Sequence, residues 1–562
     1  MSNLEFVAPD AGVWEQDGIH FPLPMSRFQQ EAFPEGFMRG FRTGTACYGL
    51  MLECIEPAFV HGFYYHRPRI FGAPPDAKGP PPKEVFQQVC EQVPEIKARL
   101  ETASTVLQKK PWREHLKHWD TVLKPASTAN QLRLQSKDLR AMTDAELTAH
   151  IRECFENAKA MVFQHHIYTI TCGVTMGDFM AGAMEWTGLP ASEITQAVRG
   201  STPISSGVTD EYLAALQALH NDPAAQDILN SNAPPGEVLE ILCAIPGLTG
   251  AAVKTYLSLV SHHVVGGYDI TCKTAIELPE ILVRSLQARP SPNEARAAEQ
   301  AVREQTARIR AAVPEEHRVD FDERLAEARL VYRLRDERSY WSDLWSAGVA
   351  RHAMLEAGRR LSERGLIKNA EHALDATCSE IVAPFEGGAG VDADELERRY
   401  QFRTTATNSM APPTLNGHPS PPPPPDWFPP AAQRTMRAIG AFMGLTFGAS
   451  ERTSEESIVR GISVSAGVYE GRARVIDRMD ELDKIQKGEV LVTRSTSTAF
   501  NYVLPLIGAV VTDRGGLMSH AAIVAREYGL PGVVGCKVAT TTIPDGARVR
   551  VDAGKGEVTI LS

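Results

Sequence analysis

The sequence lacks the patterns typical of membrane-spanning, disulfide-stabilised and nucleic-acid-binding proteins. None of its 562 residues lies in an apolar run of about eighteen, the length that a membrane-spanning helix needs, and the N-terminus has no basic, apolar signal pattern. The nine cysteines are scattered without a C-x-x-C pair, so they indicate neither a disulfide framework nor a zinc site. A net charge of −11 argues against nucleic acid as a partner, because a phosphate backbone requires a basic face. We therefore expect a cytoplasmic protein that binds neither a membrane nor nucleic acid and has no metal ligands of its own.

Residues 1–410 also lack a glycine-rich nucleotide loop and any rhythm of strand, turn and strand. Helical patterns predominate there instead. A capping box, Thr143-x-x-Glu146, leads into apolar residues at helical spacing, namely Leu147, Ile151, Phe155 and Val162. Similar signals predict helices over Asp210–His220, Asn293–Val313 and Asp322–Gly365.

A proline-rich segment, Ala411–Pro430, forms the clearest boundary in the chain. Its proline runs exclude helix and sheet ladder and favour a stiff polyproline-II spacer. Such a spacer suits a domain that must travel between two sites; a plain linker or a ligand for an aromatic-groove module is the alternative. We expect a helical domain over 1–405, the linker with a short helix at Ala431–Gly448 over 406–455, and a third domain over 456–562.

The most informative stretch is Gly515–Arg526, which lies between a predicted buried strand, Gly508–Val511, and a predicted helix, Ala521–Tyr528. His520 therefore lies at a helix N-terminus, where unpaired N–H groups and the helix dipole favour an anion. The paired glycines let the backbone approach a phosphoryl group closely. A neutral histidine nitrogen can attack phosphorus and pass the group onward, so we interpret His520 as a phosphorylated nucleophile. The alternative is a structural histidine in a loop.

Three blocks of sequence, Gly461–Ala473, Thr512–Arg526 and Glu527–Gly535, together resemble the swivelling phosphohistidine domain of phosphoenolpyruvate-utilising enzymes. The resemblance covers roughly 458–562 and implies a β/β/α domain, so the expected fold class is multidomain α plus α/β. Met518 departs from pyruvate-phosphate dikinases, which usually have a small hydroxyl residue there, and resembles rifampin phosphotransferases. Ser495–Phe500 replaces the Asp-Pro stretch that is common upstream.

The resemblance implies a two-step mechanism. No ATP-grasp domain is recognisable in 1–410 and no pyruvate-binding barrel follows Ser562, so we expect the acceptor to bind in the helical domain and ATP to bind a separate ATP-grasp subunit. This layout is similar to phenylphosphate synthases and cresol-phosphorylating systems. His520 would attack ATP, with Mg²⁺ bound mainly by the partner, take the β-phosphoryl group with release of AMP and phosphate, and pass it to a small organic hydroxyl, for which a phenol is the preferred candidate.

Phosphoryl transfer also needs cations, a base and a dry pocket. Besides Gly515, Gly516 and Ser519 in the loop, the phosphate-binding candidates are Arg335, Arg338 and Arg351 on a predicted helix, with a solvated basic face as the alternative. Consecutive histidines on a helix point about 100° apart, so at most one of each pair would face a pocket squarely. The candidates for substrate binding or for the base are His20, His165, His166, His262, His263 and Asp269. A buried, hydrogen-bonded side chain is the alternative for each of the four paired histidines, and His20 could instead brace a loop.

Two other functions stay open. One is an antibiotic- or alcohol-modifying kinase whose ATP domain is encoded apart. The other is a phosphohistidine carrier or interaction protein without acceptor chemistry of its own. We favour catalysis, because an inert carrier scarcely needs a helical domain that covers residues 1–405.

Overall fold

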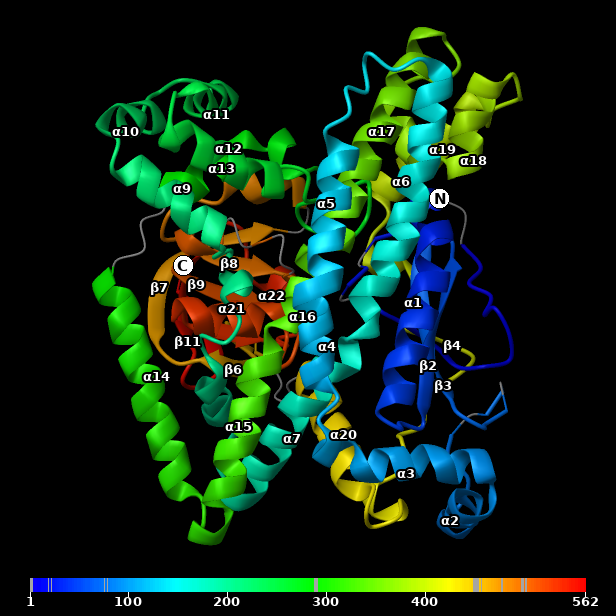
Figure 1. Cartoon of the computed structure of the whole chain (residues 1–562), viewed down its shortest axis with the longest axis vertical. Helices are drawn as coiled ribbons and strands as arrows, with labels where there is room; N and C mark the ends of the chain where they lie inside the picture. The colour runs from blue at the N-terminus through cyan, green and yellow to red at the C-terminus, as the bar shows by residue number, and fades with distance from the viewer. Residues whose placement is uncertain are drawn as a thin grey trace. The chain divides into compact units, whose positions relative to one another are not determined.

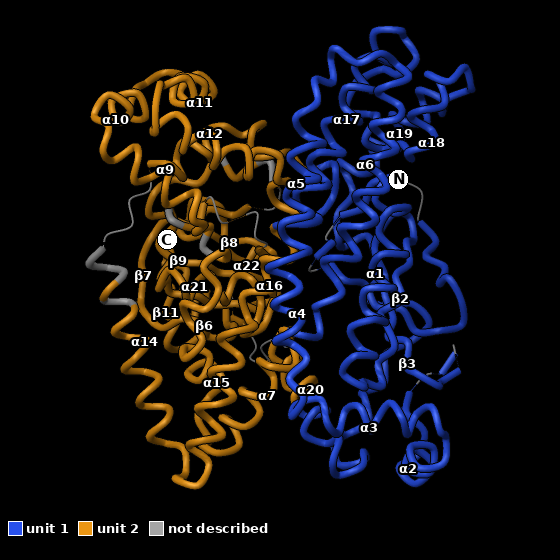
Figure 2. Tube along the Cα trace, in the orientation of Figure 1, with its two compact units in different colours: residues 1–171, 268–271, 341–437 blue, residues 172–267, 272–340, 438–562 orange. Residues whose placement is uncertain are grey.

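The computed structural model describes residues 4–18, 20–21, 23–74, 76–77, 79–287, 292–447, 454–455, 457–476, 479–496, 500 and 503–561. The chain divides into two compact units that interleave in sequence (Figure 2). Unit 1 comprises residues 1–171, 268–271 and 341–437, and unit 2 comprises residues 172–267, 272–340 and 438–562. The compact units group the chain differently from the domains expected from sequence, whose boundaries at 405 and 456 stay predictions.

Unit 1 is built around two long helices that pack side by side and run in the same direction, α1 (Arg27–Cys47) and α6 (Asp144–Ile167), with α17 (Asp343–Glu363) against α6 (Figure 1). Close approach of α1 to α6 requires glycine, because a Cβ at Gly36 would lie 2.6 Å from the carbonyl oxygen of Lys159. The remaining helices of this unit are α2 (Lys83–Gln92), α3 (Pro94–Lys109), α4 (Trp112–His118), α5 (Lys124–Gln135), α18 (Cys378–Val382) and α19 (Ala393–Thr405).

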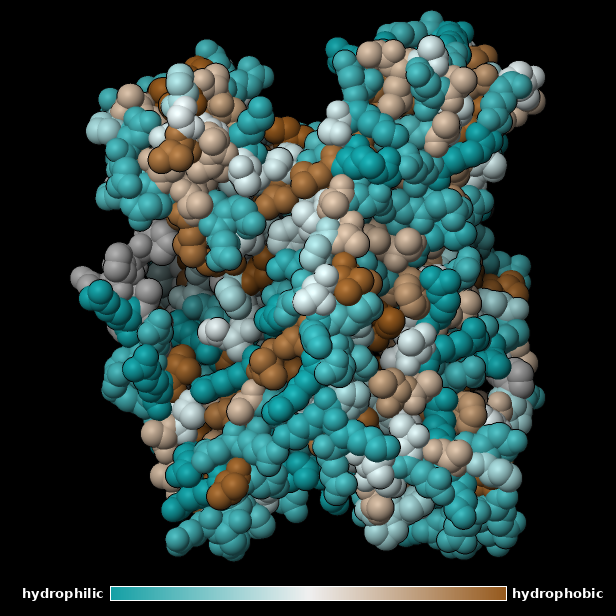
Figure 3. Space-filling model, viewed as in Figure 1, coloured by the Kyte–Doolittle hydropathy of each residue, from teal (hydrophilic) through white to brown (hydrophobic). Residues whose placement is uncertain are grey.

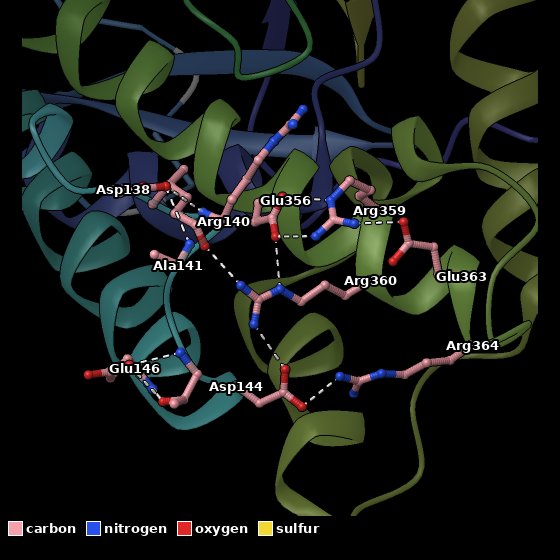
Figure 4. Close-up of polar contacts among 12 residues, drawn as sticks. Asp138, Arg140, Ala141, Asp144, Glu146, Glu356, Arg359, Arg360, Glu363 and Arg364 are labelled. Atoms are coloured by element: carbon pink, nitrogen blue, oxygen red, sulfur yellow. Dashed lines mark hydrogen bonds and ion pairs between the residues drawn. The ribbon is translucent and has the colours of Figure 1, made fainter.

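The predicted capping box at the start of α6 is confirmed. Thr143 accepts a hydrogen bond from the N–H of Glu146, and the Glu146 carboxylate accepts from the N–H of Thr143. Beside it, the buried Arg360 guanidinium of α17 binds Glu356, Asp144 and the carbonyl oxygen of Leu139 (Figure 4). These contacts fix the end of α17 to the start of α6.

The expectation that residues 1–410 contain no strand rhythm is wrong. In unit 1, β2 (Leu52–Val60) and β3 (Phe63–Ile70) form an antiparallel hairpin. Its turn residues, His61 and Gly62, have φ values of 52° and 81°, the left-handed pair that a tight hairpin requires. The apolar and aromatic residues around this turn were the signal in the sequence.

The proline-rich segment also contains a short strand, contrary to the expectation that it excludes a sheet ladder. β4 (Thr414–Leu415) pairs with β1 (Trp14–Gln16), and the four strands of this sheet, among the residues described, have the order β2-β3-β1-β4. Leu415 and Trp14 are buried in one hydrophobic cluster with Phe63 and Tyr65. The two residues of β4 are not prolines, and they are enough for this pairing. The expected short helix beyond the prolines is confirmed as α20 (Gln433–Phe447).

The helices of unit 2 agree with the sequence patterns. Those predicted over Asp210–His220 and Asn293–Val313 are confirmed as α9 (Asp210–His220) and α14 (Pro292–Ala312), and the pattern from Asp322 is divided among α15 (Arg318–Tyr332), α16 (Leu334–Tyr340) and α17. Further helices of this unit are α7 (Thr169–Thr187, mostly in this unit), α8 (Ala191–Ile194), α10 (Pro223–Leu229), α11 (Pro235–Ala244), α12 (Leu248–Val260), α13 (Pro279–Gln287), α21 (His520–Tyr528) and α22 (Ala539–Thr542).

A sheet occupies the C-terminal part of unit 2. Within the described part of the chain its eight strands have the order β5-β12-β11-β7-β8-β9-β10-β6, with β7 to β10 mutually parallel. Every residue of β8 and β9 is buried, as expected for parallel strands covered on both faces. The strands are β5 (Ile458–Arg460), β6 (Ile462–Ser465), β7 (Val468–Ile476), β8 (Val490–Thr493), β9 (Ala509–Thr512), β10 (Gly532–Val534), β11 (Arg548–Asp552) and β12 (Glu557–Ile560).

The sheet domain and the helices of unit 2 share a hydrophobic core. Met518 and Ile523, from the segment around His520, pack in one cluster with Phe179 of α7, Tyr332 of α15 and Phe442 of α20. The fold class, a large helical region with a C-terminal sheet domain, is confirmed. No helix among the residues described is long and apolar enough to cross a bilayer. On the face drawn in Figure 3, hydrophobic residues lie in small separate patches among hydrophilic ones.

Candidate functional site

The segment that carries His520 has the local structure predicted from sequence. β9 ends at Thr512, a glycine loop follows, and His520 is the first residue of α21 (His520–Tyr528). Gly515 has φ 103°, and a Cβ there would lie 2.7 Å from Oγ of Ser519, so both the backbone conformation and the space require glycine. The side chain of Ser519 caps α21 by accepting from the N–H of Ala522.

The loop is held by backbone and side-chain contacts on both sides. The N–H groups of Gly516 and Met518 donate to the carbonyl oxygens of Thr446 and Leu445, 3.1 Å away in each case, in the last turn of α20. The buried Arg526 guanidinium donates from Nη1 to the carbonyl oxygen of Leu517 over 2.8 Å. These contacts fix the loop, and hence the start of α21, before any phosphoryl group arrives.

The imidazole of His520 is buried, with 6% of its surface exposed. Its pKa is lowered to about 4, chiefly by burial; the charge of Asp336 opposes this shift and the charge of Arg335 adds to it. Oγ1 of Thr496 lies 3.0 Å from Nδ1 of His520. When Nδ1–H donates to this oxygen, Nε2 keeps the lone pair that a nucleophile needs. The histidine is thus neutral at physiological pH, as the predicted phosphorylation requires.

Two further groups near His520 come from the helical part of unit 2. Asp336 on α16 is buried and accepts hydrogen bonds from Nη1 of Arg335, 2.8 Å away, and from the hydroxyl of Ser205. Burial raises the pKa of Asp336, but the charges of Arg335 and His520 and the hydrogen bond from Ser205 outweigh it, so the pKa lies below its ordinary value. A carboxylate and a guanidinium therefore both act on the imidazole of His520.

The three candidate arginines are not a solvated basic face. Arg335 and Arg338 lie on α16, where Arg338 is buried and Arg335 is mostly buried. Both charges act on Asp336. Arg351 on α17, in unit 1, is 1% exposed and donates from Nη1 to the carbonyl oxygens of Ile270 and Thr271. Its contacts are those of a structural residue, and the phosphate-binding role of each arginine stays a prediction.

In unit 1, His165 and His166 have separate partners although their rings stack, with centroids 4.3 Å apart. Nδ1 of His165 lies 2.6 Å from Oδ2 of Asp343, and Nδ1 of His166 lies 2.8 Å from the carbonyl oxygen of Val162. The two rings lie face to face, whereas helix geometry predicted that the two side chains would point in different directions. A carboxylate-paired histidine suits a base, so the role of His165 stays open as a prediction.

The other base candidates have mainly structural surroundings. His20 is exposed and pairs with Asp17 over 2.6 Å, and Pro22 beside it lies outside the described residues. Asp269 accepts hydrogen bonds from the N–H groups of Ser26 and Thr271. In unit 2, Nδ1 of His262 lies 3.0 Å from Oγ of Ser261, while burial lowers the pKa of His263 to about 3. Their proposed roles stay predictions.

Sequence reasoning missed two groups that act on His520, Thr496 and Asp336, and the hydrogen-bond partner of Asp336, Ser205. Thr496 belongs to the stretch Ser495–Phe500, of which Ser497–Ala499 lie outside the described residues. No pattern in the sequence pointed to Ser205. Asp336 lies in the charged run Leu334–Arg338, and buried charges are rare unless they are paired, so a charged helix next to Val331-Tyr332 was the available signal. Met518, the departure noted in the sequence, accepts a hydrogen bond at Sδ from the Tyr332 hydroxyl, 3.4 Å away.

Comparison with known families agrees with this geometry. Residues 485–556 match the family described as PEP-utilising enzyme, mobile domain. Over this range the chain is similar to the mobile domain of PEP-utilising enzymes. The matched range contains the glycine loop, His520 and α21, and this match confirms the resemblance seen in the sequence.

Three relatives extend the similarity. Rifampicin phosphotransferase of Streptomyces sp is 28% identical over 76% of this chain and 48% of its own length. Chondramide synthase of Chondromyces crocatus is 30% identical over 43% of this chain and 6% of its own length. Rifampicin phosphotransferase of Bacillus cereus is 46% identical over 20% of this chain and 13% of its own length. The chain thus matches half or less of each relative, and these similarities support a phosphotransferase role.

Proposed function

We propose that this chain is the phosphoryl-carrying subunit of an ATP-dependent phosphotransferase of the dikinase type, acting in the cytoplasm. The observation that carries the proposal is the environment of His520: a neutral imidazole at a helix N-terminus, behind a glycine loop, beside Asp336 and Arg335. Few structural roles require a buried histidine to combine these features, whereas a phosphoryl carrier requires all of them.

In the first half-reaction, Nε2 of His520 attacks the β-phosphorus of ATP that is bound with Mg²⁺ by a separate ATP-grasp subunit. As the bond from Nε2 to the β-phosphorus forms, the bond from that phosphorus to the oxygen of AMP breaks, and water then removes the γ-phosphoryl group as phosphate. Overall, His520, ATP and water give phosphohistidine, AMP and phosphate. His520 suits this attack because burial keeps its imidazole unprotonated and Thr496 can hold the proton on Nδ1. This chain contributes the nucleophile, and the helix N-terminus at which His520 lies favours the anionic phosphoryl group.

In the second half-reaction, the bond from Nε2 to phosphorus breaks as a bond from the acceptor oxygen to phosphorus forms. The guanidinium of Arg335 would stabilise the charge on the transferring group. Asp336 is the carboxylate whose charge acts on His520, and it would take the proton of the acceptor hydroxyl. The acceptor is a small organic hydroxyl, for which a phenol is preferred from the family resemblance.

The proposal is tested by incubating the chain with ATP labelled at the β-phosphate, with and without the ATP-grasp protein encoded nearest to it. Intact mass and acid-labile label are then measured for the wild-type chain, for His520→Ala and for His220→Ala, an exposed histidine at the end of α9. Label on the wild-type and His220→Ala chains alone, and only with the partner, supports the proposal. Absence of label under every pairing overturns it.

The second half-reaction is followed by adding phenol, an aliphatic alcohol or rifampicin to the labelled chain. Label that leaves His520 and appears in one of these compounds identifies the acceptor class. Stable label with all three favours the alternative function, a phosphohistidine carrier without acceptor chemistry of its own.

A further inference from the structure

The structure contains a second contact between α21 and the helical part of unit 2, at the opposite end of α21 from His520. Glu527 lies in the last turn of α21, and each of its carboxylate oxygens is 2.9 Å from the backbone N of Gly200. The hydroxyl of Thr202 donates to Oε1 of Glu527 over 3.3 Å. A charged acceptor shared by an N–H and a hydroxyl makes a stronger contact than a neutral one.

Two neighbouring residues extend this contact. Nη2 of Arg199 donates to the backbone carbonyl oxygen of Glu527 over 3.0 Å, at the C-terminal end of α21, where a cation complements the helix dipole. Nε2 of Gln196 donates to the carbonyl oxygen of Val464, in β6, over 3.3 Å. Residues 196–202 thus contact the mobile domain through its backbone as well as through Glu527.

The same short segment continues to the site of His520. Three residues after Thr202, Ser205 donates its hydroxyl proton to Asp336, and the turn Pro203–Ser206 packs against both α21 and α16. One stretch of chain therefore connects Glu527, at one end of α21, with the carboxylate that acts on His520 at the other end.

We propose that residues 196–205 and Glu527 form a docking latch that holds the mobile domain where His520 faces Asp336. Glu527 is then a positioning residue for transfer to the acceptor, an inference that rests on the function proposed above. The latch must open in each cycle, because His520 is only 6% exposed and a nucleotide cannot reach it in this arrangement. Its position suits opening: Gly200 is exposed and Glu527 is half-buried, so water can replace these hydrogen bonds as they break.

The latch is tested with Glu527→Ala in the full-length chain. The first measurement is the rate at which diethylpyrocarbonate modifies His520, followed by mass spectrometry of its peptide. Loss of a charge-assisted contact should expose His520 and raise this rate roughly tenfold to hundredfold. Glu470→Ala is the matched control, since Glu470 pairs with Arg550 inside the mobile domain and should leave the rate unchanged.

The second measurement separates the two half-reactions. Glu527→Ala should form phosphohistidine at least as fast as the wild-type chain but pass it to the acceptor roughly tenfold to hundredfold more slowly. If no form of the chain is phosphorylated, the proposed function fails while the modification rate of His520 still decides the latch. Unchanged modification and unchanged transfer in Glu527→Ala would show ordinary static packing and overturn the latch.

Arg199→Met tests the same contact from the helical side. It removes the hydrogen bond to the Glu527 carbonyl while leaving the mobile domain unaltered, so it answers the question even if Glu527→Ala folds poorly. Faster modification of His520 with slower acceptor transfer is expected again. Equal slowing of both half-reactions, without added exposure of His520, would contradict the latch.

Discussion

Oγ1 of Thr496 lies 3.0 Å from Nδ1 of His520, although Thr496 lies in the segment after β8 and His520 begins α21. This contact is the orienting partner that a nucleophilic imidazole needs, because it fixes the ring and keeps the proton on Nδ1. We predict that Thr496→Val lowers the rate of phosphohistidine formation about 10- to 100-fold, whereas Thr496→Ser keeps most of it. Single-turnover phosphorylation with labelled ATP measures both. Equal rates for the valine and serine variants would show that the hydroxyl has no orienting role.

The charge balance at His520 gives a prediction for its titration. Burial lowers the pKa to about 4, and Asp336 is the group that opposes this shift. Asp336→Asn removes the opposing charge, so the pKa should fall further, and the histidine should stay neutral to a lower pH. Nuclear magnetic resonance of labelled histidine, assigned by comparison with His520→Ala, measures the midpoint. A midpoint that rises in Asp336→Asn would contradict the interaction.

The same shift has a consequence for stability. The folded-state pKa of His520 lies below its ordinary value near 6.5, so the unfolded chain binds this proton more readily. The contribution of the neutral histidine is therefore complete above about pH 6.5 and is lost as the pH falls towards about 4. We predict that the free energy of unfolding of His520→Gln, which cannot be protonated, declines less over this range than that of the wild-type chain. Urea titrations at several pH values compare the two slopes.

Local patterns in the sequence predicted the local structure around His520, but they could not predict its partners. The strand, the glycine loop and α21 depend on residues within one short stretch, so propensity and glycine placement were sufficient. The contact of Ser205 with Asp336 joins residues 131 positions apart, and that of Gly200 with Glu527 joins residues 327 apart. Such pairings depend on how the helices pack, which a single sequence does not encode in any local pattern.

The missed hairpin in unit 1 has a different cause. Helical signals surround β2 and β3, and the turn at His61-Gly62 lacks the Asn-Gly or Asp-Gly pair that most strongly marks a hairpin. A histidine at positive φ is uncommon, so only the glycine marked the turn itself in the sequence. The nearby aromatic residues were the better guide, because aromatic and β-branched residues fit a pleated, half-buried surface.

Arg360 provides a stability prediction for unit 1. Its buried guanidinium binds Glu356, Asp144 and a backbone carbonyl, whereas Arg364 binds only Asp144 among the contacts drawn and is much more exposed (Figure 4). Arg360→Ala should lower the free energy of unfolding by about 3 kcal/mol, because it leaves the buried Glu356 with fewer partners. Arg364→Ala should cost less than about 1 kcal/mol. Urea midpoints of the two variants, compared with the wild-type chain, measure the difference, and equal losses would contradict the distinction.

Gly177 links helix packing in unit 2 to the phosphohistidine loop. It lies on α7 where α20 crosses, and a Cβ there would lie 1.8 Å from the carbonyl oxygen of Ala438, a backbone atom that cannot turn away. The C-terminal carbonyls of α20, those of Leu445 and Thr446, accept the N–H groups of the loop before His520. A displacement of α20 should therefore move this loop and change the position of His520.

We predict that Gly177→Ala lowers the free energy of unfolding by about 1–3 kcal/mol and also slows phosphohistidine formation. Gly236→Ala on α11 is the matched control, because a Cβ added at Gly236 would have no neighbouring atom within 4 Å. Alanine favours a helix by up to about 1 kcal/mol over glycine, so this control should be neutral or slightly stabilising. Urea unfolding and single-turnover phosphorylation of both variants test the pair. Destabilisation of Gly177→Ala without slower phosphorylation would show that the loop holds its geometry independently of α20.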